Sequence, residues 1–369
     1  MNSHTHFMEL AMEQARKGLG RTSPNPQVGC VIIKNGRLVA KGYHRQAGAP
    51  HAEVVALQRA GTKARDSEVF VNLEPCAHEG RTGPCTEALI EAGVRRVWVA
   101  MRDPNPLVDG RGIRRLRRAG ISVEVGLLKE QAAVLNEAFV HVMRHHRVFC
   151  VAKLAQSLDG RVATAGGESQ WITSPAARDL GRRLRGEVDA IVVGVNTVGA
   201  DDPRLTCRHR SGRDPIRIIV DTQARTSPQA KVVGLGKRGS RAPTWIVVGP
   251  QASSRRRRAL ERAGAETLTC KVRRGHIDLE AMTSRLCERQ ILSVLVEGGP
   301  TLMGGFFDAG LIDKAHLFIA PSIIGGVKAP GAVGGRGIET LSQRWNLEHL
   351  QVGQLGDELY LVGYPHRVT

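Results

Sequence analysis

The chain has 369 residues and a mass of 40.0 kDa, and 41% of its residues are hydrophobic. This length favours two globular domains, and the sequence has no run of eighteen apolar residues that could form a membrane span. The formal net charge of +18 is compatible with nucleic-acid binding, but only 4% of residues are aromatic, which leaves few side chains on which bases could stack.

The N-terminal segment 7–15 alternates acidic and apolar residues at helical spacing, whereas a signal peptide has an uncharged apolar core. We therefore expect it to form the first helix of the fold. The seven cysteines are odd in number, which argues against a disulfide framework and favours a reducing compartment. Together these features predict a cytoplasmic protein.

The first half of the chain then alternates strand and helix signals. Residues 28–40 form two apolar runs around Asn35-Gly36, a dipeptide typical of a type I′ hairpin. Hydrophobic periodicity predicts helices at 52–60, 86–92 and 112–119 and strands at 69–73, 96–101 and 121–125.

Three zinc-ligand candidates lie in this half: His51, directly before a predicted helix, and Cys76 and Cys85, each directly after a proline. A zinc ion held by one imidazole and two thiolates has a fourth position for water, whose pKa the metal lowers. Glu53 is placed to move protons between that water and a leaving ammonia. The set predicts the catalytic zinc site of a base deaminase.

Two other interpretations remain open at this point. The three residues could be part of a closed structural zinc site, with His78 as the nearby fourth ligand, or the cysteines could be buried apolar residues. The sequence around them is rich in Gly, Arg and His, which is a poor core sequence. Cys76 and Cys85 are also farther apart than in the PCxxC pattern of base-editing deaminases, and the longer loop, with His78 and Arg81, could hold a polar substrate.

The loop Pro75-Cys76-Ala77-His78-Glu79-Gly80-Arg81-Thr82-Gly83-Pro84-Cys85 resembles that of the bifunctional riboflavin-biosynthesis deaminase/reductase family. Other segments resemble this family in the same order along nearly the whole chain: 22–29, 42–44, 103–106, 157–160, 167–172, 201–206 and 297–301. The resemblance implies an α/β protein with an N-terminal cytidine-deaminase-like three-layer domain and a C-terminal dihydrofolate-reductase-like domain. It also implies that Asn25, His44, His78 and Asn105 orient the base.

The domain boundary is expected near residue 146, because 137–147 is polar and His-rich and a new apolar strand follows at 148–154. This gives domains 1–146 and 147–369. The second half has apolar strands separated by helices, which predicts an α/β domain. Strands are expected at 190–194, 216–221, 244–249, 293–297, 316–320 and 359–363, and helices include 175–185 and 255–263.

A glycine-rich segment, 297–305, follows the predicted strand at 293–297 and leads into a helix. Glycines at such a position let backbone amides approach a phosphate, although they often serve turn geometry alone. There is no GxGxxG after the first strand of this half. The resemblance implies NADPH as cofactor, bound by Ala155, Trp171, Thr197, Asp201, Thr222, Gly299, Pro300, Thr301, Leu302, Met303, Gly304 and Gly305.

The resemblance further implies that the phosphorylated pyrimidine substrate is held by Ser169, Arg185, Leu205, Arg208 and Glu297. Reduction of an opened ribose needs a group that supports charge developing on the heteroatom. Lys153 and Asp201 are the ionisable residues that we expect to do this. The family thus predicts a deaminase that uses one zinc ion per chain, joined to an NADPH-dependent reductase.

The charge supports one competing function, a deaminase that edits RNA or DNA and grips it with its basic second half. The arginine runs 111–118 and 255–258 read instead as solvated helix faces. A zinc-stabilised binding module without activity is a third possibility, in which Glu53 would be dispensable. We expect small-molecule substrates, a homo-oligomer, and neither membrane nor nucleic-acid partners.

Overall fold

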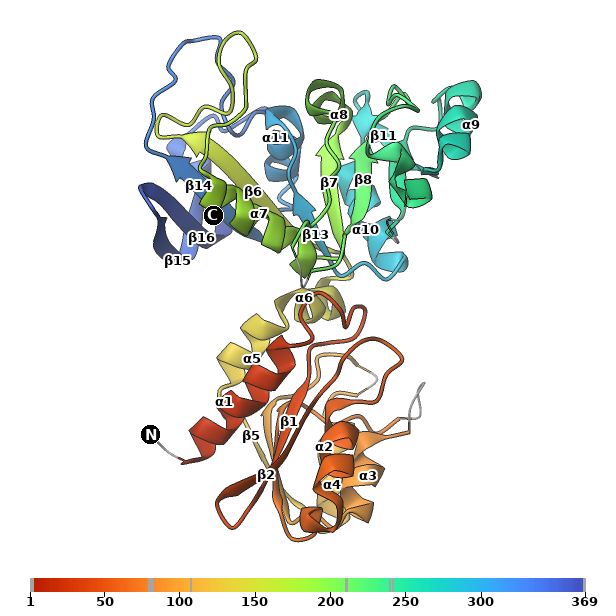
Figure 1. The fold of residues 1–369 in the computed structure, drawn as a ribbon, viewed down its shortest axis with the longest axis vertical. Coiled ribbons are helices and arrows are strands. Elements are labelled where there is room, and N and C mark those ends of the chain that lie inside the picture. The colour runs from red at the N-terminus through yellow and green to blue at the C-terminus, as the bar shows by residue number, and fades with distance from the viewer. Residues whose placement is uncertain are drawn as a thin grey trace. The chain divides into compact units, whose positions relative to one another are not determined.

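The computed structural model describes residues 3–78, 83–106, 108–209, 212–238, 240 and 242–367. The chain divides into two compact units, residues 1–146 and 147–369 (Figure 1). Each unit is a sheet covered by helices, so the predicted α/β class is confirmed.

The first unit contains a five-stranded sheet with the strand order β2-β1-β3-β4-β5. β1 is antiparallel to β2 and β3, while β3, β4 and β5 are parallel. Asn35 and Gly36 turn between β1 and β2 with φ values of 51° and 70°, as the predicted hairpin requires. The strands are β1 Gly29–Lys34, β2 Arg37–Tyr43, β3 Glu68–Leu73, β4 Arg96–Met101 and β5 Ser122–Val125.

Helices cover both faces of this sheet, which gives three layers (Figure 1). Cys30 and Ile32 of β1 point into a core shared with α2, α3 and α4, whereas the alternate residues of β1 face α1. α2 approaches β2 closely, since a Cβ on Gly42 would lie 2.3 Å from the carbonyl oxygen of Ala52. The helices are α1 Ser3–Arg16, α2 Ala52–Ala60, the 3₁₀ helix η1 Gly61–Ala64, α3 Cys85–Glu91, α4 Arg111–Arg118, α5 Lys129–Leu135 and α6 Glu137–His145.

The second unit contains a nine-stranded sheet with the order β10-β9-β8-β7-β13-β6-β14-β16-β15. In this order the first seven strands, β10 through β14, pair in parallel. β16 pairs antiparallel with β14, and β15 pairs antiparallel with β16 at the edge of the sheet. These strands are β6 Phe149–Ser157, β7 Ala190–Gly194, β8 Ile216–Val220, β9 Thr244–Val248, β10 Glu266–Thr269, β13 Ser293–Val296, β14 Lys314–Ala320, β15 Trp345–Leu355 and β16 Glu358–Arg367. A separate hairpin consists of β11 Val272–Arg273 and β12 His276–Ile277.

The central parallel strands are buried on both faces, as their continuous apolar sequences predict. In β7, Ala190 and Val192 point into one core cluster and Ile191 and Val193 into another. Ser174, Ser253 and Asp278 cap α7, α9 and α10 by accepting a backbone N–H in the first turn. The helices are α7 Pro175–Glu187, α8 Val195–Asp201, η2 Val233–Arg238, α9 Ser254–Ala263, α10 Leu279–Glu288, α11 Pro300–Asp308 and η3 Leu341–Gln343.

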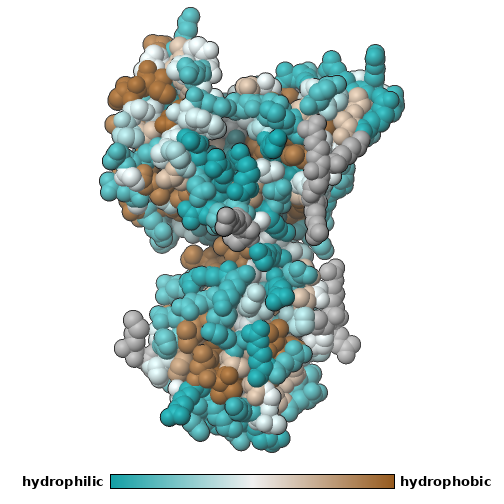
Figure 2. Space-filling view, viewed as in Figure 1, coloured by the Kyte–Doolittle hydropathy of each residue, from teal (hydrophilic) through white to brown (hydrophobic). Residues whose placement is uncertain are grey.

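Hydrophilic residues cover most of the face seen in Figure 2. The two arginine runs lie on α4 and α9, where most of these side chains are exposed, as predicted for solvated helix faces. Within the described part of the chain, no helix combines the length and the apolar character needed to cross a membrane.

Candidate active sites

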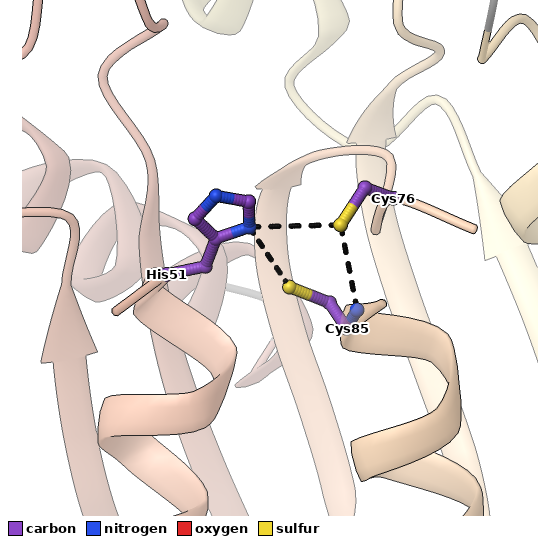
Figure 3. Close-up of side chains that lie close together, drawn as sticks. All are labelled: His51, Cys76 and Cys85. Carbon is purple, nitrogen blue, oxygen red and sulfur yellow. Dashed lines mark hydrogen bonds between the residues drawn. The ribbon is translucent and has the colours of Figure 1, made fainter. Parts of the chain in front are cut away.

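The first candidate site is formed by three side chains that converge from separate elements of the first unit (Figure 3). His51 is the N-cap of α2, Cys76 follows β3, and Cys85 begins α3. The Nδ1 atom of His51 lies 3.1 Å from Sγ of Cys85 and 3.6 Å from Sγ of Cys76. All three ligand atoms lie within 4.8 Å of one another.

These donors fit a tetrahedral zinc ion. Zinc-ligand bonds of about 2.0–2.1 Å to nitrogen and about 2.3 Å to sulfur give an N···S edge of about 3.6 Å. One observed N···S distance matches this edge and the other is about half an ångström shorter. His78 is exposed and is not part of the cluster found among the described residues, so the geometry supplies three protein ligands.

The electrostatics of the cluster favour a thiolate at Cys76. Hydrogen bonds with Cys85 and His51 lower the pKa of Cys76 to about 4, although burial opposes the shift. The contact with Cys76 and burial both raise the pKa of Cys85, and the contact with Cys76 also raises the pKa of His51. The backbone N–H of Cys85 donates to Sγ of Cys76 at 3.4 Å. A deprotonated sulfur is the form that binds a metal.

Glu53 lies in the first turn of α2, two residues after the N-cap His51, and is only 3% exposed. Burial, and then the charge of Cys76, raise the pKa of its carboxyl to about 7. The neighbouring charge of His51 and the Cys85 side chain lower this pKa in part. The acid therefore lies against the ligand cluster, in an environment that lets it both accept and release a proton near neutral pH.

The buried His44 and the half-buried Asn25 form a pair beside the cluster. Nδ1 of His44 lies 3.2 Å from the carbonyl oxygen of Pro50, and its Nε2 lies 3.1 Å from Nδ2 of Asn25. A neutral ring with its proton on Nδ1 satisfies both contacts, and burial lowers the pKa of His44. The rings of His44 and His51 meet edge to face at 5.3 Å, so this pair extends the site from the β2 side.

Glu74 fixes the segment that carries Cys76, a role that the sequence analysis did not predict. Its carboxylate accepts the backbone N–H groups of Gly110 at 2.9 Å, Ile113 at 3.1 Å and Asp103 at 3.3 Å. α4 approaches the same segment, because a Cβ on Gly112 would lie 1.9 Å from the carbonyl oxygen of Pro75. An acidic residue just after a buried strand and two residues before the ligand Cys76 was the available signal.

The second candidate site is a cavity of about 1030 Å³ in the second unit. Its lining residues come from the ends of β7 and β8, the start of α11 and α8. The N-cap Gly299 donates its N–H to Oγ1 of Thr197 at 3.3 Å. Free amides at a helix N-terminus bind phosphate groups, so these residues fit the pyrophosphate of a dinucleotide. The lining includes Gly194, Thr197, Thr222, Gly299, Pro300, Thr301, Leu302 and Gly305.

A buried charge cluster lies under α7 in the same unit. Arg185 donates to both carboxylate oxygens of Glu297, at 2.8 and 2.7 Å, and their side chains are 15% and 9% exposed. Burial alone would raise the pKa of Glu297, but Arg185, Lys153 and Arg208 together lower it. Burial lowers the pKa of Lys153, whose Nζ lies 5.5 Å from the ring centre of Phe318.

Comparison with known proteins finds a matching family for each of the two units. Residues 1–101 match the cytidine and deoxycytidylate deaminase zinc-binding region, and residues 148–361 match the RibD C-terminal domain. The riboflavin biosynthesis protein RibD of Bacillus amyloliquefaciens is 41% identical over 98% of this chain and 96% of its own length. RibD of Escherichia coli is 42% identical over 97% of this chain and 99% of its own.

The chain belongs to the RibD family. Its fold matches that of Acinetobacter baumannii RibD with a TM-score of 0.89 at 38% identity, covering 99% of each chain. It also matches a Thermotoga maritima diaminohydroxyphosphoribosylaminopyrimidine deaminase/5-amino-6-(5-phosphoribosylamino)uracil reductase, with a TM-score of 0.86 at 33% identity and 99% coverage of each chain. The protein is a bifunctional enzyme of riboflavin biosynthesis, a deaminase and a reductase.

The structure brings most of the predicted deaminase residues of this RibD protein together. The three ligands, Glu53, Asn25 and His44 lie in one neighbourhood. His78 is exposed, and the backbone N–H of Asn105 donates to Asp103 at 2.8 Å. Arg81, expected in the long loop, lies outside the described residues.

The predicted reductase residues divide into three groups. Thr197, Thr222, Gly299–Leu302 and Gly305 line the cavity, while Lys153, Arg185, Arg208 and Glu297 form the charge cluster. The remaining residues lie outside both groups. Met303 and Leu205 are buried in hydrophobic cores, and Gly304 packs on Gly334. Trp171 is 67% exposed with Arg178 over its ring, Asp201 is exposed at the end of α8, and Ala155 and Ser169 are half-buried.

Two arginines near the charge cluster were missed by the sequence analysis. After burial, the charges of Arg182, Arg185 and Arg204 lower the pKa of Arg208, so four guanidinium groups lie within electrostatic reach of one another. Arg185 also donates to the carbonyl oxygen of Thr206 at 3.3 Å, which fixes the segment 204–208 against α7. An excess of arginine over a buried carboxylate is typical of a phosphate site.

Proposed function

We propose that this RibD protein deaminates 2,5-diamino-6-ribosylamino-4(3H)-pyrimidinone 5′-phosphate and then reduces the ribosyl group of the product to ribityl. The observation that carries the proposal is the convergence of His51, Cys76 and Cys85 within 4.8 Å, beside the buried acid Glu53. The cavity and the charge cluster of the second unit support the reductive step.

In the deamination, His51, Cys76 and Cys85 would hold one zinc ion per chain. A zinc ion in such a site lowers the pKa of its water to about 7. Glu53 would pass a first proton from the water to the ring nitrogen and then a second proton, from the hydroxyl that has added to the carbon, to the amine, which leaves as ammonia. Asn25 and His44 present fixed polar groups beside the cluster, and with His78 and Asn105 they would orient the base.

In the reduction, the second unit binds NADPH in the cavity and the phosphorylated substrate at the arginine cluster. NADPH supplies a hydride to the carbon of the opened ribose. Lys153 donates the matching proton to the heteroatom, because burial lowers its pKa and so makes it a better acid. A phosphate dianion bound by Arg185 and Arg208, with Arg182 and Arg204 nearby, would offset the mutual repulsion of these guanidinium groups.

Asp201 is exposed at the end of α8, whereas Lys153 lies in the charge cluster with Glu297, so we favour Lys153 over Asp201 as the proton donor. Trp171, Asp201 and Ala155 stay in the proposal as cofactor contacts, and Ser169 and Leu205 as substrate contacts. Cytoplasmic location is supported by the seven free cysteines. A homo-oligomer stays a prediction.

The two activities are tested separately on the full chain. Ammonia release from the diaminopyrimidinone substrate is followed colorimetrically, and oxidation of NADPH is followed by its absorbance with the deaminated pyrimidine as substrate. Glu53→Gln should lower ammonia release by a factor of about 10² to 10⁴, while zinc content and NADPH oxidation stay at the wild-type level.

Glu91→Gln is the matched control, because Glu91 is exposed at the end of α3 and the charge change is the same. Unchanged ammonia release in Glu53→Gln would overturn the role of Glu53. A wild-type chain that oxidises no NADPH with the deaminated substrate would overturn the reductive step.

A further inference from the structure

The cavity of the second unit has a basic rim that the proposed reduction does not use. The hairpin β11–β12 contributes Arg273, Arg274 and His276 to the lining, and the segment after β8 contributes Arg225. In Figure 1, β11 lies at the same end of the sheet as α8. A cavity of about 1030 Å³ is large enough for a dinucleotide, so this rim lies within reach of one end of such a ligand.

The hairpin is built so that its basic side chains face the cavity. Val272 pairs with Ile277 and Arg273 with His276, so the two pairs point to opposite faces. Ile277 is 5% exposed in a hydrophobic core. Arg274 and Gly275 have φ values of 52° and 79°, which makes a tight two-residue turn. The buried Ile277 thus anchors the hairpin at the wall of the cavity, while Val272 is 39% exposed, and the exposed Arg273 and His276 on the opposite face also belong to the lining.

Contacts at Gly249 place this hairpin beside the end of β8. A Cβ on Gly249 would lie 2.7 Å from Cγ2 of Val272 and 3.3 Å from Cγ2 of Thr222. Thr222 also lines the cavity. Hence the hairpin lies near Thr222, two residues after the end of β8, whereas the N-terminus of α11, proposed to bind the pyrophosphate, starts after Gly299.

The arginine side chains of the hairpin have no polar partner among the described residues. In the described ranges of the chain, neither Arg273 nor Arg274 has a side-chain hydrogen bond or ion pair. Arg225 donates to Oδ1 of Asn196 at 3.3 Å, and Arg336 pairs with Asp308. The other acids of the lining are Asp278, which caps α10, and the exposed Glu280.

The acid at the end of β8 is turned away from the cavity. In many dinucleotide-binding α/β folds an acidic residue near a strand end binds the ribose 2′-hydroxyl of NAD, whereas an arginine accommodates the 2′-phosphate of NADP. Here Asp221 is 1% exposed, and its Oδ2 accepts from the N–H and the Oγ1 of Thr226 at 2.6 and 2.7 Å. This carboxylate is outside the lining, so it does not oppose a phosphate there.

We propose that the hairpin β11–β12 recognises the 2′-phosphate of the cofactor, with Arg273 and Arg274 as the contacting cations. This inference rests on the proposed reductive function and names the residues that decide between NADPH and NADH. A guanidinium without a protein partner forms charge-assisted, bidentate bonds with a phosphate.

The test compares two nucleotides that differ in one phosphate. Isothermal titration of the full chain with 2′,5′-ADP and with 5′-ADP measures the contribution of the 2′-phosphate directly, without turnover. The wild type should bind 2′,5′-ADP more tightly. The double variant Arg273→Gln/Arg274→Gln should lose about tenfold or more in affinity for 2′,5′-ADP, while its affinity for 5′-ADP stays within about twofold.

Arg255→Gln/Arg256→Gln is the charge-matched control, because both residues are exposed on α9 and outside the lining. It should behave as the wild type, and the ratio of kcat/KM for NADPH over NADH should fall only in the hairpin variant. Equal losses for both nucleotides would show that the hairpin binds another part of the ligand, and no loss for either would remove it from the site.

Both of these outcomes overturn the inference while leaving the proposed reductase in place. A wild-type chain that binds neither nucleotide and oxidises no NADPH would instead overturn the proposed reduction, and this inference with it.

Discussion

Gly304 of α11 is packed so closely that adding one methyl group should destabilise the second unit. A Cβ at Gly304 would lie 2.2 Å from the carbonyl carbon and oxygen of Gly334 and 2.4 Å from the nitrogen of Gly335. To reach ordinary contact near 3.4 Å, the segment around Gly334 must retreat by roughly 1 Å. The opposing atoms are backbone, so no side-chain rotation relieves the overlap.

The neighbouring Gly305 provides an internal control in the same helix. Its Cβ would meet the Cδ1 atom of Leu279 at 3.3 Å, a side-chain tip that can rotate away. Alanine in a helix interior is favoured over glycine by about 1 kcal/mol, whereas overpacking costs about 1–3 kcal/mol. We expect Gly304→Ala to lower the free energy of unfolding by about 2 kcal/mol and Gly305→Ala to leave it unchanged or raise it slightly.

The assay must isolate the second unit, because a chain with two compact units need not unfold in one step. Hydrogen exchange read by mass spectrometry on peptides from 293–320, at increasing urea, reports the stability of β13, α11 and β14 alone. The free energies of unfolding of the two variants should differ by about 2–3 kcal/mol in these peptides. Equal effects of the two substitutions would refute the packing argument.

Three further predictions concern the metal loop, the proton donor and acid stability. Gly112→Ala should push the Pro75 carbonyl away and lower bound zinc per chain in metal analysis. Lys153→Met should lower kcat of NADPH oxidation by about 100-fold with cofactor affinity unchanged in titration. Burial lowers the pKa of His316 to about 4, below its unfolded value of about 6.5. Between about pH 4 and about pH 6.5 the unfolded chain therefore binds more protons than the folded chain, and the free energy of unfolding should fall by up to about 3 kcal/mol as the pH drops through this range. In urea titrations at these pH values, His316→Gln should lose less stability than the wild type.

Each of these predictions has a contrary result. Gly83 has open space around its Cβ position, so Gly83→Ala should keep its zinc, and equal zinc loss in both variants would contradict the packing account. A Lys153→Met enzyme with the wild-type rate, or with weakened cofactor affinity to match its slower rate, would exclude the proposed role. If the pH profile of His316→Gln follows that of the wild type, the acid sensitivity lies in other groups.

Elements with a simple pattern were predictable from the sequence. The helix at 52–60 and the strands at 96–101 and 190–194 have the predicted bounds, because periodic or continuous apolar residues mark them. β15 was not predicted, since it lies at a sheet edge and most of its residues are exposed. The hairpin of β11 and β12 is too short for any period to appear.

The zinc ligands were predictable because histidine and cysteine are themselves residue types that bind zinc, whatever their neighbours in the fold. Glu74 was not, since its role depends on which N–H groups the fold brings to it. Arg217 illustrates the same limit: it has no exposed surface inside β8, where its guanidinium donates to Thr244, Ser240 and the carbonyl oxygen of Ala242. Partners this far along the chain are fixed by packing, and packing is visible only in three dimensions.

The ligands of the metal site are delivered by a helix start, a strand end and a second helix start, each held by contacts that do not involve the metal. The scaffold can therefore assemble without the ion, so cells short of zinc would accumulate folded enzyme that lacks deaminase activity but keeps its reductase unit. Supplying the ion afterwards should restore deamination at the speed of a binding event, without any refolding.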